Sequence, residues 1–284
     1  MKKTWKLYVG GEFPRSESGR SYPVADAKGK FWANASQASR KDVRDAVKAA
    51  RAAFAGWSGR TAYNRAQVVY RIAEVLEGRR EQFEAELRRA EGLTAARARG
   101  SVDAAIDRIV WYAGWADKVA QVTGSANPVA GPYFNHSAPE PSGVIAVVAP
   151  ADPLLGLVSV VAPVITTGNT CVVVASEAHP LTAITLGEVM ATSDLPGGVV
   201  NVLTGSVAEL APWLAGHMDV NGLDLTGVAD PDLARELEAT AAENLKRVRR
   251  APEAARPDEW VETPPLDRMT TFLETKTVWH PMGV

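Results

Sequence analysis

The sequence predicts an α/β fold built on a Rossmann-like, doubly wound parallel sheet with helices placed before it. Two observations carry this prediction. In the second half of the chain, short apolar segments alternate with segments of helical periodicity. In the first half, long stretches repeat apolar residues at helical spacing. Strands that are apolar along their whole length are typical of a parallel sheet covered by helices on both faces.

The N-terminal part is predicted to begin with short strands and to continue with three long helices. Ser39, followed by Asp42 three residues later, is a capping signal at the start of the first helix. The apolar stripe of this helix extends to Trp57. The second and third helices are expected over about 62–89 and 102–119. Their apolar stripes are interpreted as core packing.

The alternating part supplies the sheet, whose sites are expected at the carboxyl ends of the strands. Strands are predicted at 144–149, 171–174, 199–203 and 222–225, and helices at 154–166, 180–191, 207–215 and 229–247. The basic run at 246–250 is then the solvated end of the last helix, with binding of nucleic acid or an anionic ligand as the alternative. After a charged, proline-rich stretch, residues 275–279 predict a short strand.

Composition and charge narrow the function classes. A formal net charge of −2 favours neither nucleic acid nor an anionic membrane as a partner. No apolar run reaches the roughly 20 residues that a membrane-spanning helix needs, and the N-terminal segment lacks the apolar stretch of a signal peptide. A single cysteine excludes an internal disulfide, which agrees with a reducing compartment. We therefore expect a cytoplasmic protein without nucleic-acid or membrane partners.

The individual reactive side chains favour structural interpretations. Cys171 lies inside an apolar strand with no neighbouring cation, so a buried thiol is expected rather than a nucleophile. The four histidines, His136, His179, His217 and His280, lack metal-ligand spacing with Cys, Asp or Glu, so no metal site is expected. The sequence contains no serine nucleophile elbow, P-loop or GxGxxG motif.

Ten segments resemble the aldehyde dehydrogenase superfamily, and they follow one another in the order of that family. They lie at 7–13, 42–57, 64–79, 111–119, 143–150, 162–183, 195–205, 225–227, 243–248 and 274–279. Within the superfamily, the chain is most similar to the family-16 branch in three segments, RKDVRDAVKAA, TAYNRAQVVY and PLLGLVSVVAPVITTGNT. In that branch a full dehydrogenase is fused to a truncated, non-catalytic second copy, and it is this second copy that the chain resembles.

The resemblance implies a division of the chain. Residues 1–250 correspond to the dinucleotide-binding domain, with a projecting β-flap at about 121–143. Residues 251–265 form a proline-rich linker in place of the catalytic domain, which is expected to be absent. Residues 266–284 are the C-terminal oligomerisation strand. In the family the flap adds strands to a neighbouring subunit through main-chain hydrogen bonds, and such a contact survives the loss of catalysis.

The resemblance also implies that the catalytic positions are lost. The family's chemistry needs a cysteine thiolate, an oxyanion donor and a base for thioester hydrolysis. The ELGG motif that precedes the nucleophile is missing, and Ala251 stands where the base Glu would be. The oxyanion Asn belongs to a Pro-Trp-Asn-Phe-Pro motif, but here the place reads Pro150-Ala151-Asp152-Pro153, one residue short. We therefore expect no catalytic residue.

The position that binds the cofactor's ribose is altered as well. The family places a ribose-binding Lys just after the second strand, where this chain has Val174 and Ala175. Glu177 remains there as a possible ribose partner.

The pyrophosphate motif of the family, Phe-Thr-Gly-Ser followed by a second Gly, is kept only in part. Thr226 and Gly227 are retained, Val228 replaces the Ser, and Asp232 stands where the second Gly is expected. An acidic group disfavours an anion at a helix N-terminus. We therefore expect no cofactor, or NAD(P) bound weakly at best through the vestigial residues Glu177, Thr226 and Gly227. The alternative for these residues is a plain framework role.

Three functions follow as hypotheses. The first is a pseudo-enzyme that serves as an assembly subunit and pairs through the β-flap with a full-length aldehyde dehydrogenase or with itself. The second is an NAD(P)-dependent aldehyde oxidoreductase component completed in trans. The third is a nucleotide-sensing binding module without turnover. The first is favoured because catalytic and cofactor positions are lost while both flap segments are kept.

Overall fold

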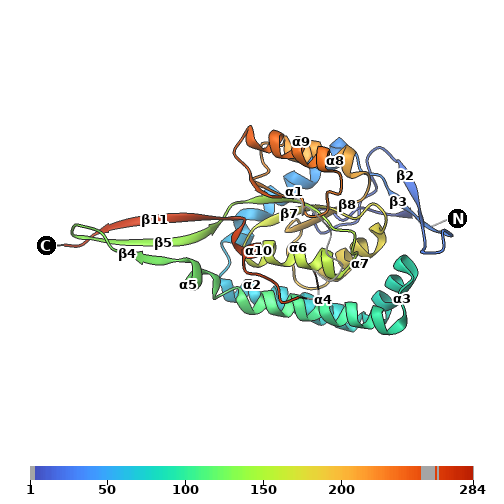
Figure 1. Ribbon diagram of the computed structural model, residues 1–284, viewed down its shortest axis with the longest axis horizontal. Coiled ribbons are helices and arrows are strands. Elements are labelled where there is room, and N and C mark those ends of the chain that lie inside the picture. Colours follow the sequence, from blue (N-terminus) through green and yellow to red (C-terminus); the bar gives the residue numbers. More distant parts are fainter. Residues whose placement is uncertain (1–3, 251–259, 261, 284) are drawn as a thin grey trace.

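The computed structural model describes residues 4–250, 260 and 262–283. Its centre is a five-stranded parallel sheet of order β10-β9-β6-β7-β8 (Figure 1). The strands are β6 (Val144–Val148), β7 (Thr170–Val174), β8 (Val200–Leu203), β9 (Gly222–Asp224) and β10 (Arg247–Arg249). The predicted Rossmann-like parallel sheet is confirmed. Most of the linker expected at 251–265, Ala251 included, lies outside the described residues.

Helices cover both faces of this sheet. One face carries α1 (Arg40–Ser58), α8 (Val207–Ala215) and α9 (Pro231–Ala242), and the other carries α2 (Ala62–Gly78), α4 (Ala95–Trp115), α6 (Leu155–Thr166) and α7 (Pro180–Ala191). In β6, Val144, Ala146 and Val148 pack toward α1 and α8, whereas Ile145 and Val147 pack toward α6. Because both faces of β6 are buried, its sequence is apolar at every position.

The helix predicted over 62–89 is two helices. Arg79 leaves the helical conformation, with φ −114° and ψ 16°, and separates α2 from α3 (Arg80–Glu91). The break turns α3 so that Phe83 and Leu87 join the core beneath α7. The helix predicted over 102–119 starts earlier, where Thr94 caps α4, and a short helix α5 (Val119–Thr123) follows it.

The helix predicted over 229–247 is also too long. It ends at Ala242, and Leu245, with a φ of 58°, turns the chain into the edge strand β10. The basic run at 246–250 therefore lies at the sheet edge and not at a helix end. Arg247 pairs there with Glu274, and Arg249 pairs with Asp267 at 3.0 Å. Edge strands often carry charged side chains, so β10 lacks the apolar run that marks the buried strands in the sequence.

The N-terminal residues form a second, three-stranded sheet of order β1-β3-β2. Its strands are β1 (Thr4–Trp5), β2 (Ser21–Ala25) and β3 (Phe31–Ser36). The sheet is joined to the central one through Tyr8, whose amide nitrogen donates to the carbonyl of Val202 at 3.0 Å. Burial raises the pKa of the Tyr8 phenol to about 12.

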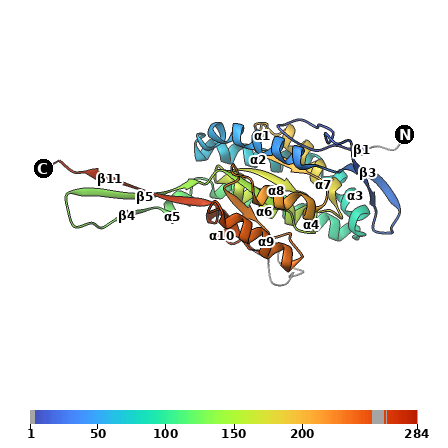
Figure 2. The same ribbon diagram turned by 90° about the horizontal axis from the view of Figure 1, so that it is seen from above.

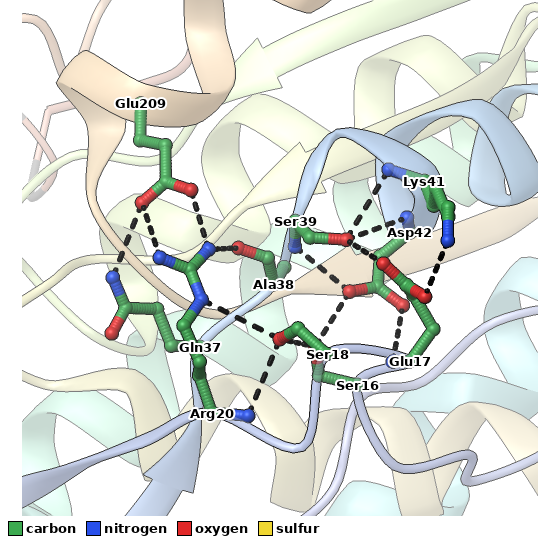
Figure 3. Close-up of polar contacts among 10 residues, drawn as sticks. All are labelled: Ser16, Glu17, Ser18, Arg20, Gln37, Ala38, Ser39, Lys41, Asp42 and Glu209. Atoms are coloured by element: carbon green, nitrogen blue, oxygen red, sulfur yellow. Dashed lines mark hydrogen bonds and ion pairs between the residues drawn. The ribbon is translucent and has the colours of Figure 1, made fainter.

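A polar network holds this N-terminal segment against α1 and α8 (Figure 3). Ser39 and Asp42 form the predicted capping box of α1. The Asp42 carboxylate also accepts from the Ser16 hydroxyl at 2.7 Å. Arg20 forms an ion pair with Glu209 in the first turn of α8 at 2.5 Å. Asp42, which takes part in the capping box of α1, therefore also holds the loop that contains Ser16.

The β-flap is a separate antiparallel sheet of order β11-β5-β4 that projects from the body (Figures 1 and 2). Its strands are β4 (Ser125–Asn127), β5 (Tyr133–Pro141) and β11 (Leu273–Pro281), which the short helix α10 (Asp267–Thr270) precedes. The strands β5 and β11 pair in continuous register from Leu273 with Pro141 to Pro281 with Tyr133. These strands lie in the two segments from which the flap was expected.

Asn169 joins the flap to the sheet. Its side-chain oxygen accepts from the Gly143 amide at 2.9 Å, just after β5. Its side-chain nitrogen donates to the Phe272 carbonyl at 3.0 Å, just before β11. The residue is fully buried between these two flap strands and β7. A single amide therefore satisfies the backbone at the root of both long strands.

We predict that Asn169→Ala lowers the free energy of unfolding by about 3 kcal/mol, because it leaves the buried Gly143 amide without its acceptor. Urea denaturation followed by circular dichroism measures this change. Asn64→Ala, which removes exposed hydrogen bonds on α2, serves as the control and should cost less than about 0.5 kcal/mol. Equal effects of both substitutions would contradict the role of Asn169.

Candidate functional site

The expected site lies at the carboxyl edge of the central sheet, where three loops follow three neighbouring strands. Asp152 follows β6, Glu177 follows β7, and Thr226 and Gly227 follow β9. Because the strand order is β9-β6-β7, the β6 loop lies between the other two. The structure therefore brings Thr226 and Gly227 next to the β6 end, and it places Glu177 two strands away from them.

Glu177 is exposed on the loop between β7 and α7. One of its carboxylate oxygens lies 3.4 Å from the amide nitrogen of Val207, the first residue of α8. A carboxylate in this position stabilises the helix N-terminus through the helix dipole. Glu177, the predicted ribose partner, therefore already contacts the start of α8, and its side chain is exposed to solvent.

Thr226 is buried, and its polar groups face inward. Both its amide and its hydroxyl donate to the same carboxylate oxygen of Asp224, the former at 2.9 Å. The other Asp224 oxygen lies 3.5 Å from the guanidinium of Arg268, and both of these residues are buried. The carboxylate thus receives donors from two sides. Both donors of Thr226 are used by the protein itself, which favours the framework interpretation.

Gly227 has a steric reason to be glycine. A Cβ added at this position would lie 2.0 Å from the carbonyl oxygen of Ala149. The close approach is fixed by a hydrogen bond from the Gly227 amide to the Val148 carbonyl at 3.0 Å. The loop after β9 therefore packs directly on the end of β6, and a side chain would push the two segments apart.

Asp152 has a structural role that the sequence analysis missed. One of its carboxylate oxygens accepts from the amides of Leu154 at 3.1 Å and Gly156 at 3.0 Å, so it caps the start of α6. Nearby, burial lowers the pKa of His179, and the charge of Asp152 partly opposes that effect. The signal available in the sequence was an Asp just before an apolar helix, which is a common cap.

The N-terminus of α9 corresponds to the place where the family motif would hold a pyrophosphate. Here the Asp230 side chain caps the helix and accepts from the amides of Asp232 at 2.9 Å and Leu233 at 3.4 Å. Pro231 removes a further amide donor. Asp232 adds a second carboxylate, which is paired with Arg235.

Two carboxylates and a proline at this helix start do not fit a bound pyrophosphate. The amides that would bind the anion already donate to Asp230, and a dianion would lie close to like charges. The side chain at Val174, where the family has a Lys, is apolar and buried. At these two positions, the described residues therefore differ from those with which the family binds its cofactor.

Cys171 lies in β7 and is completely buried. Burial raises the pKa of its thiol well above the usual range. A thiol that stays protonated in an apolar strand is not a nucleophile. The predicted structural role of Cys171 therefore agrees with its surroundings.

The sequence led us to expect neither a metal site nor a membrane-spanning helix. Within the described ranges, no three His, Cys, Asp or Glu side chains gather in a way that could hold a metal ion. Among the helices that the structure describes, none combines the length and the apolar character needed to cross a membrane.

The sheet, its covering helices and the flap define an α/β dinucleotide-type domain, and comparison with known proteins gives its family. The family model described as "Aldehyde dehydrogenase family" matches residues 13–254. A putative aldehyde dehydrogenase, DhaS, of Bacillus subtilis is 32% identical over 87% of this chain and 50% of its own length. A mitochondrial aldehyde dehydrogenase, family 2 member B4, of Arabidopsis thaliana is 34% identical over 86% and 45%. The chain therefore belongs to the aldehyde dehydrogenase family.

Solved structures give the same result. The NAD⁺ complex of an aldehyde dehydrogenase from Bacillus cereus superposes with a TM-score of 0.81 and 26% identity, over 87% of this chain and 50% of that one. The HpcC protein from Thermus thermophilus superposes with a TM-score of 0.81 and 29% identity, over 87% and 47%. The chain spans about half the length of the relatives it matches.

We predict that Gly227→Ala lowers the free energy of unfolding by about 3 kcal/mol, because the new methyl group would overlap the Ala149 carbonyl. Thermal and urea denaturation of the ligand-free protein measure the loss. Gly100→Ala, on an open surface of α4, is the matched control and should raise stability by about 0.5–1 kcal/mol. An unchanged stability of Gly227→Ala would argue against a framework role.

We also predict that the Cys171 thiol does not react with a thiol-specific reagent such as DTNB in the folded protein at about pH 8, close to the ordinary pKa of a free thiol. The reason is that burial both shields the thiol and raises its pKa. The same reagent should label one thiol per chain after unfolding in urea. Rapid labelling of the native protein would show that the β7 strand is more accessible than the structure indicates.

Proposed function

We propose that this chain is a non-catalytic aldehyde dehydrogenase homologue, similar to the truncated second copy of the family-16 enzymes. It serves as an assembly subunit that pairs through its β-flap with a full-length aldehyde dehydrogenase or with a second copy of itself. The observation that carries the proposal is a contrast between two regions. The carboxyl edge of the sheet is closed by the chain's own carboxylates, whereas the flap offers open strands and exposed apolar side chains.

At the carboxyl edge of the central sheet, three polar side chains form hydrogen bonds within the protein itself. Asp152, at the place of the oxyanion donor, caps α6 and carries a negative charge that would oppose an oxyanion. Asp230 occupies the amides of the α9 N-terminus. Thr226 donates both its amide and its hydroxyl hydrogen bonds to Asp224. These contacts support a loss of dinucleotide affinity inside the retained domain.

The flap, in contrast, exposes aromatic side chains at its tip. Trp279 is 56% exposed and Tyr133 is 43% exposed, and their rings meet edge to face with centroids 5.7 Å apart. On the opposite side of the sheet, Phe134 is 51% exposed and stacks on His136. Large apolar groups on a projecting sheet are typical of an interaction surface.

Side-chain hydrogen bonds join the three strands of the flap to one another. On the face that carries Tyr133 and Trp279, the Asn127 side chain donates to Asn135 and Ser137, and Ser137 shares a hydrogen bond with Thr277 at 2.8 Å. These contacts cross all three strands. The outer edges of β4 and β11 keep backbone groups that can pair with another strand.

A nucleotide-dependent function is the competing proposal, either as an oxidoreductase component completed in trans or as a sensing module. Its support is Glu177, which is exposed beside the N-terminus of α8. Isothermal titration with NAD⁺ and NADP⁺ at millimolar concentration separates the alternatives. Heat of binding without aldehyde oxidation would favour a sensing module, and aldehyde oxidation by the purified chain would overturn the pseudo-enzyme proposal.

We predict that Phe134→Glu weakens self-association, or association with a full-length aldehyde dehydrogenase, by about tenfold or more, because it buries a charge in an apolar contact. Sedimentation velocity and size-exclusion chromatography with light scattering measure both associations. Tyr63→Glu changes another exposed aromatic residue, on α2, and should leave both associations unchanged. If the unaltered chain is monomeric and binds no full-length relative, the assembly role is wrong.

A further inference from the structure

A groove outside the carboxyl edge of the sheet combines cationic and apolar side chains. It has a volume of about 700 Å³ and lies where the start of α1 meets the end of α8. Its lining consists of Arg40, Lys41, Val43 and Arg44 from α1, and Pro212, Trp213, Gly216 and His217 from α8 and the turn after it. Glu177 contacts the other end of α8, so the groove is distinct from the dinucleotide-type edge. Its volume is in the range of small-molecule sites.

Arg40 is the central feature of the groove. Its guanidinium carbon lies 4.2 Å from the centroid of the Trp213 ring. Stacking on an indole fixes the plane of a guanidinium and leaves its N–H edge available for other partners. Arg40 makes no ion pair or side-chain hydrogen bond with any residue in the described part of the chain. Its donors are therefore held in position and unused.

The neighbouring cations differ from Arg40 in this respect. Lys41 is paired with Glu17 at 3.1 Å, and Arg44 is paired with Asp45 at 2.9 Å. Both pairs are exposed, and such pairs contribute little and can rearrange around a stronger anion. The groove therefore contains one guanidinium whose donors are free for a ligand, and two further cations nearby on α1.

The opposite wall is apolar and remains open to solvent. Trp213 is 44% exposed, and Pro212 and Gly216 extend its surface. His217 accepts a hydrogen bond at its Nδ1 from the Asp219 amide at 3.1 Å, so its neutral ring carries the proton at Nε2 as a donor. A ligand that matches this groove needs an anionic group and a flat or apolar body.

We propose that this groove binds a small organic anion in which a phosphate is attached to a planar ring. The phosphate would lie against the N–H edge of Arg40, with Lys41 and Arg44 nearby, and the ring would lie against Pro212 and the part of Trp213 that the guanidinium leaves exposed. Arg and phosphate match in geometry because the guanidinium can donate two parallel hydrogen bonds. The site is independent of the assembly role and of the dinucleotide edge.

Phenyl phosphate is the probe, because it carries both groups and no nucleotide features. Isothermal titration of the full chain at low salt is expected to show binding at millimolar concentration or below. Phenol and inorganic phosphate, which each lack one group, should bind at least about tenfold more weakly. Affinity should fall as salt concentration rises, because ions screen the phosphate from the cations.

Three variants locate the binding. Arg40→Gln and Trp213→Leu should each weaken phenyl phosphate by about tenfold or more, since one removes the anion receptor and the other removes the ring surface. Lys48→Gln removes the same charge from α1 outside the groove and is the matched control. Circular dichroism and thermal denaturation verify that each variant is folded.

Three results would overturn the proposal. The first is the absence of phenyl phosphate binding to the folded, unaltered chain. The second is equal binding of phenyl phosphate to the Arg40→Gln variant and to the Lys48→Gln control. The third is binding of a glutamate-rich peptide without binding of phenyl phosphate, which would assign the groove to an acidic protein segment instead.

Discussion

Burial of the central strands on both faces is the constraint on which the rest of the structure depends. A strand such as β7 has no solvent-facing side, so Val172, Val173 and Val174 are apolar and Cys171 is a buried thiol. Charged side chains are thereby placed at the strand ends and in the loops that follow them. In this chain, these positions use their carboxylates on the protein's own backbone and cations, at Asp152, Asp224 and Asp230.

The same constraint explains what could be predicted from the sequence. Apolar runs locate β6 and β7, shorter and interrupted ones locate β8 and β9, and helical periodicity locates the helices between them. The strand β10 was missed because it lies at the edge, where Arg247 and Arg249 pair with acidic residues far along the chain. The break at Arg79 was missed because tertiary packing of Phe83 and Leu87 decides it, and not local preference.

The candidate site was predictable in its location and not in its contacts. A parallel sheet places Glu177, Thr226 and Gly227 at one edge by topology alone. That Thr226 is engaged by Asp224, and that Asp224 meets Arg268 from α10, depends on how the returning chain packs. The cap at Asp230 was readable from an Asp-Pro start, whereas the stacking of Arg40 on Trp213 joins helices that are distant in sequence.

The pairing of β5 with β11 has a consequence for the order of folding. It joins residues 133–141 to residues 273–281, and so it closes a loop of well over a hundred residues. During synthesis the central sheet can form first, since β6 to β10 end at Arg249. The long flap strand β5 must wait, unpaired on one edge, until β11 has left the ribosome. A chain that associates through this flap would therefore become competent to do so only once β11 has been synthesised, after the strands of its own central sheet.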